Sequence, residues 1–339
     1  CNMTPDLNIS LKPFHFFASE EKSNFFTRIQ NENQVEEAVH WCHENKYPFL
    51  IIGSGSNILF TKNFAGLIAK MEMMGIKKTN ETPSDVTLQV AAGENWHHFV
   101  SYCVQKGWGG LENLSLIPGT VGASPIQNIG AYGAEIQECI EHVKAYDTLA
   151  KQWIYLSNKE CGFGYRTSVF MLQPNRYIIT HVEYILQKQP ILKTDYGAIR
   201  EVLHDKGIKN PSLANVAAAV TQIRTHKFPD PKILGNTGSF FKNPILSKEK
   251  YTELEKSFPN MIAHPISDKE YKVAADWLIA SCGWKGIRKG NVGCYEKQAL
   301  VIVSYGIKSG KEVYDFSEEI IHAVQTKFGI TLDREINVY

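Results

Sequence analysis

Residues 116–133 read LIPGTVGASPIQNIGAYG, and this stretch does more than any other to decide the fold. It holds four glycines and two prolines among small, mostly uncharged side chains, so it cannot form a packed helix. A long surface loop is one interpretation, although surface loops usually carry more charge and fewer apolar residues. We favour the other interpretation, a tight and rigid loop whose backbone lies against a large flat ligand.

A second glycine-rich segment, GSGSN at residues 53–57, follows an expected buried strand at 49–52. Its glycines would let backbone N–H groups turn toward a phosphate. The segment is not a dinucleotide-binding fingerprint, because Ile58 replaces the third glycine and an expected strand at 58–60 replaces the helix. It also lacks the Gly-Lys-Ser/Thr ending of a P-loop. On its own, the segment predicts a hairpin turn as readily as a phosphate nest.

Three polar side chains lie in segments that mix glycine, aromatic and charged residues. Ser239 lies in GNTGSFFKNP, where Phe241 occupies the glycine position of a nucleophile elbow, so a serine hydrolase is disfavoured. Arg166 lies in GYRTS, and Glu335 follows Arg334 near the chain end. Taken singly, Ser239 is better interpreted as a turn or capping serine, and the two charged residues as salt-bridged surface residues.

Composition indicates a soluble globular protein, with 43% hydrophobic and 21% charged residues among 339. The 36 Lys and Arg against 35 Asp and Glu leave a net charge of +1. This balance argues against nucleic acid or a membrane surface as the main partner, and it leaves small anionic ligands open. No apolar run nears the roughly 18 residues of a membrane span, and no leader pattern is present. We therefore expect a cytoplasmic protein that natively starts at Met3.

The cysteines and histidines predict no metal site. The cysteines are scattered without a CxxC pair, and we expect them to be buried hydrophobic side chains in a reducing compartment: Cys42, Cys103, Cys139, Cys161, Cys282 and Cys294. His40 and His43 have helical spacing but no third ligand nearby, and the adjacent His97 and His98 face different sides of an expected helix. All four are expected to be solvated or at the core edge.

Hydrophobic periodicity predicts an α+β protein. Helices are expected at 34–46, 95–107, 212–224, 247–258, 272–282 and 312–327. Strands are expected at 49–52, 86–90, 143–146, 153–156, 177–186 and 299–304. Because the two kinds of element alternate unevenly, α+β domains fit better than one doubly wound sheet. The segment FPDP at 228–231 predicts a domain hinge.

Taken jointly, seven segments in register resemble the UDP-N-acetylenolpyruvoylglucosamine reductases (MurB). They are residues 53–57, GENW at 93–96, GLEN at 110–113, 118–133, FGYR at 163–166, GSFFKNP at 238–244, and Glu335. LKTDYG at 192–197 also matches the tyrosine-bearing loop of the longer, type I form. The resemblance covers nearly the whole chain. Arg334 departs from the family pattern, which has proline at that position.

The resemblance implies an FAD-binding fold of the vanillyl-alcohol-oxidase/p-cresol-methylhydroxylase type, made of two subdomains, plus a C-terminal MurB-type substrate-binding domain. Residues 1–70, joined by the chain end 331–339, are expected to form subdomain 1. Residues 71–227, with the Tyr196 loop, are expected to form subdomain 2, and residues 228–330 the domain that binds the UDP substrate.

The resemblance also implies a monomeric enzyme that reduces UDP-N-acetylglucosamine enolpyruvate to UDP-N-acetylmuramate in peptidoglycan synthesis. NADPH would reduce bound FAD, and the hydride would pass from the flavin to the vinyl carbon of the substrate. Arg166 would bind the substrate carboxylate and stabilise the developing enolate with help from Glu335, and Ser239 would donate the proton that follows.

The same resemblance assigns binding residues. The FAD would be held by Gly53, Ser54, Gly55, Ser56, Asn57, Pro118, Gly119, Gly122, Ala123, Ser124, Ile126 and Gly130. The substrate would be held by Tyr165, Tyr196, Lys227, Asn243 and Gln298, with Lys227 suited to the diphosphate. Two alternatives remain open: an oxygen-using FAD alcohol oxidase of the same superfamily, and a nucleotide-binding module without catalysis.

Overall fold

The computed structural model describes residues 3–339, which divide into two compact units. The first unit holds the chain up to Ile9, followed by Ser23–Gly55 and Ala65–His226. The second unit holds Ser10–Lys22, Ser56–Phe64 and Lys227–Tyr339. Two short early segments thus belong with the last third of the chain, and one changeover falls inside the glycine-rich segment 53–57.

A four-stranded sheet with the order β1-β2-β5-β3 lies in the first unit. Its strands are β1 (Asp6–Ser10), β2 (Lys22–Ile29), β3 (Phe49–Ile52) and β5 (Phe64–Met71). Helix α1 (Glu32–Asn45) connects β2 to β3 and begins where the Asn31 side chain accepts a hydrogen bond from Gln34 N at 3.0 Å. Strands β3 and β5 run parallel. This parallel pair positions the glycine-rich segment that follows β3.

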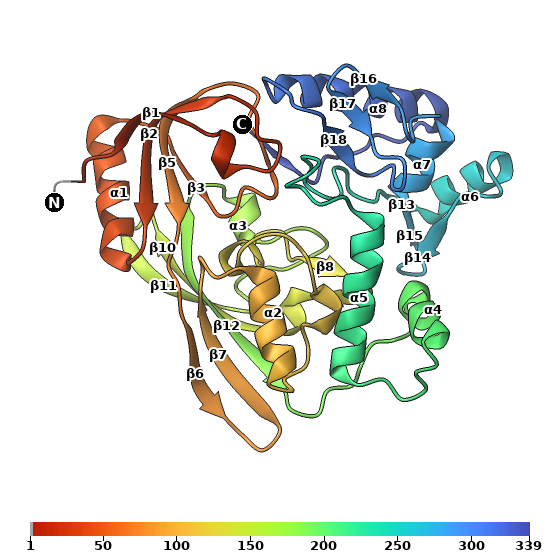
Figure 1. Ribbon diagram of the computed structural model, residues 1–339, viewed down its shortest axis with the longest axis horizontal. Helices are drawn as coiled ribbons and strands as arrows, with labels where there is room; N and C mark the ends of the chain where they lie inside the picture. The colour runs from red at the N-terminus through yellow and green to blue at the C-terminus, as the bar shows by residue number, and fades with distance from the viewer. Residues whose placement is uncertain (1–2) are drawn as a thin grey trace. The chain divides into compact units, whose positions relative to one another are not determined.

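The second sheet of this unit is antiparallel, with the order β11-β10-β12-β7-β6. Its strands are β6 (Ile76–Glu81), β7 (Asp85–Ala91), β10 (Ile140–Asp147), β11 (Gln152–Ser157) and β12 (Tyr177–Gln187). Helix α2 (Trp96–Gln105) packs on it, because the Trp96 and Phe99 rings contact the Tyr184 ring with centroids 6.1 and 5.2 Å apart. Figure 1 shows α2 across this sheet and the β6–β7 hairpin extending past the end of α2. One continuous hydrophobic core joins both sheets, α1 and α2.

Short elements and three further α-helices complete the first unit. They are η2 (Glu112–Leu114), η3 (Val121–Ala123), β8 (Gly130–Ala131), β9 (Ala134–Glu135), η4 (Ile136–Glu138), α3 (Val169–Leu172), α4 (Gly197–Asp205) and α5 (Leu213–Lys227), whose last residue falls in the second unit. A small separate core packs α4 against α5 through Ile199, Leu203, Ala219 and Val220.

The second unit is built on small sheets and three helices. One sheet has the order β13-β15-β14 and another β16-β17-β18, and β19 pairs in parallel with β4. The strands are β4 (Ile58–Leu59), β13 (Ile245–Ser247), β14 (Ala263–Pro265), β15 (Glu270–Val273), β16 (Arg288–Lys289), β17 (Val292–Cys294), β18 (Ile302–Ser304) and β19 (Asn337–Val338). The three helices are α6 (Lys248–Ser257), α7 (Ala275–Ser281) and α8 (Lys311–Phe328), and η1 (Lys12–Phe14) is a single short 3₁₀ turn. Its core includes Leu278 of α7 and Phe316 and Ile320 of α8.

Most elements expected from the sequence are confirmed with bounds that differ by up to three residues, and two of them begin three residues later than expected. The expected helix at 272–282 is wrong at its start, because Lys272 and Val273 belong to β15 and the helix begins at Ala275. Val273 is fully buried and pairs with Ala263 of β14, so strand pairing takes precedence over the helical pattern there. The strand expected at 299–304 is shorter, since β18 begins at Ile302.

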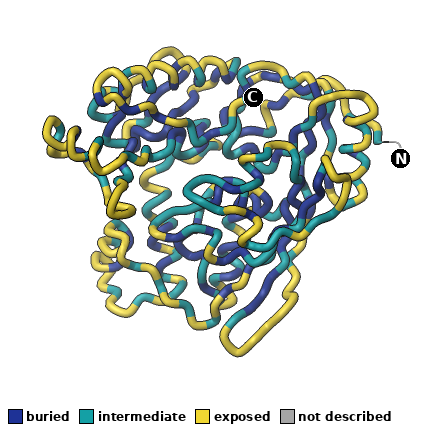
Figure 2. Tube along the Cα trace, turned by 180° about the vertical axis from the view of Figure 1, so that it is seen from behind, coloured by how far each residue is buried: buried dark blue, intermediate teal, exposed yellow. Residues whose placement is uncertain are grey.

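Buried residues follow the strands and the inner faces of the helices, as Figure 2 shows, whereas the exposed residues gather at loops and hairpin ends. Five of the cysteines named above are buried, as expected, whereas Cys282 is only partly buried. Burial raises the pKa of the Cys42 and Cys161 thiols to about 12, so these are unreactive core side chains. Among the helices of the described chain, none has both the length and the apolar character that crossing a membrane requires.

Candidate functional site

The glycine-rich segment 53–57 begins directly where β3 ends, and its Gly53 lies against Thr120 of the stretch 116–133. A Cβ atom on Gly53 would lie 2.6 Å from the Thr120 Oγ1, so only glycine allows this approach. The Ser54 Oγ is buried and has no hydrogen-bond partner among the described residues. Because an unpaired buried hydroxyl is costly, this atom points to a ligand that satisfies it.

The first half of the stretch 116–133 is held by backbone pairing to the start of α2. Trp96 N donates to Gly119 O at 3.0 Å, and Gly122 N donates to Ala92 O at 2.9 Å. Pro118 and Ala123 are exposed beside these pairs. The Ser124 hydroxyl lies in the core, 2.7 Å from the Tyr184 hydroxyl. The structure therefore gives Ser124 the role of joining this loop to β12.

Arg166 lies at the tip of a tight turn closed by Gly164 and Thr167, which pair as an isolated antiparallel bridge. Its φ of +51° lies in the left-handed region that non-glycine residues rarely adopt. The Arg166 Nη2 donates to Gly130 O at 2.8 Å, and the guanidinium lies 5.4 Å from the centre of the Tyr165 ring. A Cβ on Gly130 would lie 2.9 Å from Arg166 Nη1, so the glycine makes room for this side chain.

Ile126 also contacts the Arg166 turn through its backbone. The Ser168 Oγ, which is fully buried, donates to Ile126 O at 2.6 Å. The structure thus brings together four residues that the sequence predicted for cofactor and substrate: Ile126, Gly130, Tyr165 and Arg166.

The loop that carries Tyr196 contacts the end of the stretch 116–133. The Tyr196 ring, which is 51% exposed, meets the Tyr132 ring edge-on with centroids 5.4 Å apart. The Asn113 Nδ2 donates to both Tyr132 O at 2.9 Å and Lys193 O at 3.0 Å. Burial raises the pKa of Tyr132, so this partner of Tyr196 stays a neutral phenol. Tyr196 is therefore an exposed aromatic ring on an anchored loop.

Ser239 and Glu335 lie close together in the second unit. Ser239 pairs with Val301, and Glu335 N donates to Phe240 O at 2.8 Å. Phe241 in turn pairs with Arg334. Isolated backbone pairs thus join the segment around Ser239 to the segment of Val301 and to the segment of Glu335.

Asn57 and Arg334 fix the surroundings of Glu335. The Asn57 Nδ2 donates to Glu335 O at 3.2 Å, and Asn337 N donates to Asn57 O at 3.1 Å. The Arg334 guanidinium bonds to Ser317 and Glu318 on α8. Arg334 therefore joins the chain end to α8.

The remaining predicted substrate residues lie in the second unit. The Gln298 side chain is 3% exposed, and its Oε1 has no hydrogen-bond partner in the part of the chain that the structure describes. The Thr237 Oγ1, two residues before Ser239, is buried and unpaired in the same sense. The Asn243 Oδ1 accepts from Ala275 N at 3.0 Å and so fixes the start of α7. Lys227 is the exposed last residue of α5.

The predicted residues fall into two groups, one in each unit. Tyr165, Arg166 and Tyr196 lie in the first unit, and Ser239 and Glu335 lie in the second. Sequence reasoning singled out neither Thr120 nor Thr237. A polar side chain set beside glycines in an otherwise small-residue segment is the signal that could have found both.

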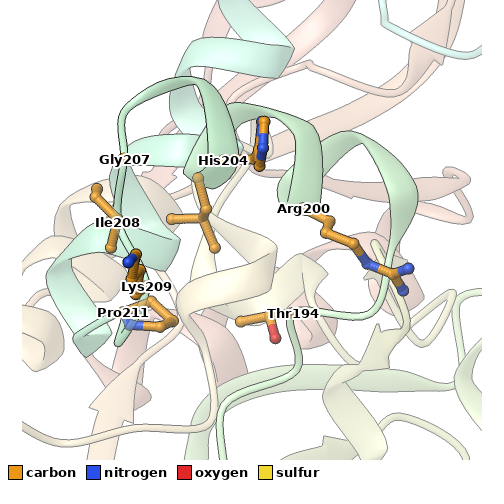
Figure 3. A pocket seen from close by; sticks show the side chains of 8 residues that line it. Thr194, Arg200, His204, Gly207, Ile208, Lys209 and Pro211 are labelled. Carbon is orange, nitrogen blue, oxygen red and sulfur yellow. The ribbon is translucent and has the colours of Figure 1, made fainter.

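A separate cavity of about 450 Å³ lies between α4 and the turn at 207–211, and Figure 3 shows its lining. Leu203 and Ile208 supply apolar surface, and the Arg200 side chain points away from the group and donates to Asp195 O at 2.8 Å. None of the predicted site residues lines this cavity.

One group of potential metal ligands converges on the second sheet. Among residues 3–339, Glu141, His142 and Glu183 offer ligand atoms that lie within 4.8 Å of one another. They lie where β10 has a register shift against β12, on a partly exposed face. The sequence-based expectation of no metal stays a prediction.

Comparison with known proteins covers both parts of the chain. The protein-family model of the UDP-N-acetylenolpyruvoylglucosamine reductase C-terminal domain matches residues 230–339, and the family model of an FAD binding domain matches residues 24–151. The chain is 40% identical over 331 residues to UDP-N-acetylenolpyruvoylglucosamine reductase of Pseudomonas syringae pv. tomato, covering 98% of each chain. It is 41% identical over 333 residues to the enzyme of that name from Amoebophilus asiaticus, again covering 98% of each.

A solved structure has the same fold. The MurB crystal structure from Thermus caldophilus matches 100% of both chains with a TM-score of 0.70 at 21% sequence identity. Together with the two domain matches, this likeness confirms the expected fold class, an α+β FAD-binding fold followed by a C-terminal MurB domain.

Proposed function

The chain belongs to the UDP-N-acetylenolpyruvoylglucosamine reductase family, and from that premise we propose how its own residues carry out the reaction. It is an FAD-dependent oxidoreductase that reduces UDP-N-acetylglucosamine enolpyruvate in peptidoglycan synthesis. The observation that carries the assignment of catalytic residues is the backbone pairing that places Glu335 beside Phe240, next to Ser239.

The glycine-rich segments fit the phosphates of FAD. The close approach of Gly53 to Thr120 holds the two glycine-rich loops side by side, and the unpaired Ser54 Oγ offers a hydroxyl. We assign the FAD pyrophosphate to residues 53–57 and to the loop that includes Pro118, Gly119, Gly122 and Ala123. When bound, FAD accepts a hydride from NADPH and supplies it to the vinyl carbon of the substrate.

Arg166 is assigned to the substrate carboxylate. An enol ether is electron-rich, so hydride addition needs stabilisation of the charge that flows onto the carboxylate. A guanidinium offers paired N–H donors for this purpose. Its contact with Gly130 O orients the side chain before substrate arrives. Glu335 is assigned to assist in stabilising the enolate.

Ser239 is assigned as the general acid. Once hydride has added to the distal vinyl carbon, the adjacent carbon carries the electron pair and takes the Ser239 Oγ proton, and solvent then returns a proton to the serine. Lys242 and Asn243 lie three and four residues further on, and we assign them hydrogen bonds that lower the cost of this transfer.

Binding of the UDP part is assigned to Tyr196, Lys227, Asn243 and Gln298, with Tyr165 beside the enolpyruvyl group. The buried Gln298 Oε1, unpaired within the described chain, would accept a hydrogen bond from the substrate. Lys227 supplies a point charge for the diphosphate.

We assign domain roles as the family suggests: residues 1–70 with 331–339 and residues 71–227 to the two FAD-binding subdomains, and 228–330 to the UDP substrate. The active form is proposed to be a cytoplasmic monomer. NADPH is proposed as the reductant.

Ser239→Ala tests the proposal in the FAD-loaded enzyme under anaerobic conditions. NADPH is expected to bleach the flavin absorbance at the wild-type rate, whereas its return on adding UDP-N-acetylglucosamine enolpyruvate slows by about 10³-fold, because a positioned acid contributes on that order. Ser257→Ala, at an exposed serine of α6, is the control and should behave as wild type. Normal return of the absorbance in Ser239→Ala would refute the assignment of the acid.

The two alternatives give different outcomes in the wild-type protein. A return of flavin absorbance with air but not with substrate would indicate an oxidase. A protein that binds FAD but is not bleached by NADPH would indicate a binding module.

A further inference from the structure

The Arg166 turn needs support from outside itself. Arg166 adopts a φ of +51°, in the left-handed region, which is sterically disfavoured for residues that have a Cβ atom. The turn is closed by backbone hydrogen bonds between Gly164 and Thr167 of 3.1 and 3.3 Å. A turn of this kind on a loop holds one geometry only when neighbouring groups fix it.

Asn128 provides such support from the adjacent loop. Its side chain is fully buried, and its Nδ2 donates to Gly164 O at 3.0 Å. The same Nδ2 donates to Glu135 Oε2 at 3.2 Å, and the Oδ1 accepts from Gln137 N at 3.0 Å. Since Gly164 O can only accept and Gln137 N–H can only donate, the orientation of the amide is fixed by its partners.

The backbone of Asn128 suits this place as well. Its φ is +45°, a left-handed conformation that asparagine adopts more readily than most residues. The main chain therefore turns at Asn128 so that the amide faces Gly164, and two residues later Gly130 O accepts from Arg166. One short segment thus holds both the backbone of the Arg166 turn and the guanidinium at its tip.

We propose that Asn128 is a positioning residue for Arg166, holding its turn in the geometry that grips the substrate carboxylate. The inference rests on the role proposed above for Arg166. Asn128 is not assigned a contact with substrate or cofactor. Its effect is expected in the step that uses Arg166, the reduction of the enolpyruvyl substrate, and not in the reduction of the flavin by NADPH.

Asn128→Asp is the sharpest test, because aspartate has nearly the same shape as asparagine and also tolerates the left-handed backbone conformation. It replaces the donating Nδ2 with an acceptor facing Gly164 O and the Glu135 carboxylate, so the support becomes repulsive. Asn175→Asp is the matched control, since Asn175 also has a positive φ, of +63°, but is exposed. Should Asn128→Asp fail to fold, Asn128→Gly removes the same hydrogen bonds while keeping the backbone conformation.

The half-reactions of the FAD-loaded enzyme are measured by anaerobic stopped flow. In Asn128→Asp, flavin reduction by NADPH should stay within about twofold of wild type, and reoxidation by UDP-N-acetylglucosamine enolpyruvate should slow by roughly 10-fold or more. Amide hydrogen exchange in the peptide 163–169 of the FAD-free protein should be faster than in wild type. Asn175→Asp should change none of these.

A double-mutant cycle with Arg166→Lys separates positioning from a general structural effect. If Asn128 acts through Arg166, Asn128→Asp should slow reoxidation by less than about twofold in the Arg166→Lys background. Equal slowing in both backgrounds, or unchanged exchange at 163–169, would overturn the inference. Slow reoxidation in Arg166→Lys together with normal reoxidation in Asn128→Asp would overturn the inference about Asn128 and leave the proposed role of Arg166 intact. An Arg166→Lys enzyme with wild-type reoxidation would overturn the proposed role of Arg166, and this inference with it.

Discussion

Gly53→Ala is expected to weaken FAD binding by forcing apart two loops of the first unit. The added methyl would lie 2.6 Å from Thr120 Oγ1 and 3.2 Å from Thr120 Cγ2, whereas ordinary contact begins at 3.4 Å. The two segments must therefore separate by about 0.8 Å at this point. Thr120 is 9% exposed, so its side chain has little room to turn away.

The size of the effect follows from the cost of overpacking, typically about 1–3 kcal/mol. Without FAD the loop at 53–57 can relax away from Thr120, but binding both loops to one pyrophosphate brings the strain back. A central value of about 2 kcal/mol corresponds to a roughly 30-fold higher dissociation constant for FAD.

Removing the obstacle should restore binding. In the double variant Gly53→Ala/Thr120→Ala, the nearest remaining Thr120 atom is the Cβ at 3.5 Å, which is ordinary contact. The dissociation constants of wild type, both single variants and the double variant are measured by titrating FAD into FAD-free protein. Wild-type affinity in Gly53→Ala, or no recovery in the double variant, would refute the reasoning. Gly93→Ala is a useful contrast, because its methyl would meet backbone atoms of Met73 at 2.5 and 2.7 Å, and no side-chain change can relieve that clash.

Two further predictions concern the stability of the first unit. Tyr184→Phe should lower the free energy of unfolding by about 1 kcal/mol, because the buried Tyr184 hydroxyl pairs with Ser124 Oγ at 2.7 Å; in a urea-unfolding cycle with Ser124→Ala, additive effects would contradict this pairing. Burial lowers the pKa of His97 from 6.5, and the neutral Nδ1 accepts from Leu116 N at 2.8 Å. Its contribution to stability is therefore complete above about pH 6.5 and is lost as the pH falls through the lower pKa of the folded protein. His97→Asn keeps an acceptor that does not titrate, so its urea midpoint should fall less than that of wild type between pH 7 and pH 5, and equal slopes would contradict the assignment.

Local signals in the sequence were sufficient for most helices. The helices expected at 95–107 and 247–258 correspond to α2 and α6, which are capped by the side chains of Asn95 and Ser247; these accept from His98 N at 2.9 Å and from Lys250 N at 3.2 Å. A cap depends on residues three positions apart, so sequence alone contains the information. Helix α4 was not predicted, and it begins at Gly197, a residue that disfavours helix.

Strands that depend on distant partners were harder to predict. Strand β5 was missed, because it is buried at consecutive positions 66–69 and so shows no alternation. Its partner β3 lies on the other side of the glycine-rich segment, with Leu50 opposite Ile68. Nothing near β5 in the sequence reports that pairing.

The candidate site shows the same division between identity and geometry. The motif named Ser124 as a residue of the FAD loop, but its hydroxyl lies against Tyr184, which is 60 residues away in sequence. Sequence could not reveal that contact, because it depends on η3 packing over β12. It could not reveal that Ser54 Oγ and Gln298 Oε1 are buried without partners within residues 3–339 either.

These contacts join short motifs of this chain that lie far apart in the sequence. The small size of Gly53 matters because Thr120 occupies the space of a side chain there, and the small size of Gly130 matters because Arg166 does the same. Asn128 then joins the loop of Gly130 to the turn of Arg166. Each of these residues is matched in size or hydrogen bonding to a residue of another motif, so a change in one should be tolerated only with a compensating change in its partner. The predicted recovery of Gly53→Ala by Thr120→Ala is the direct case of that dependence.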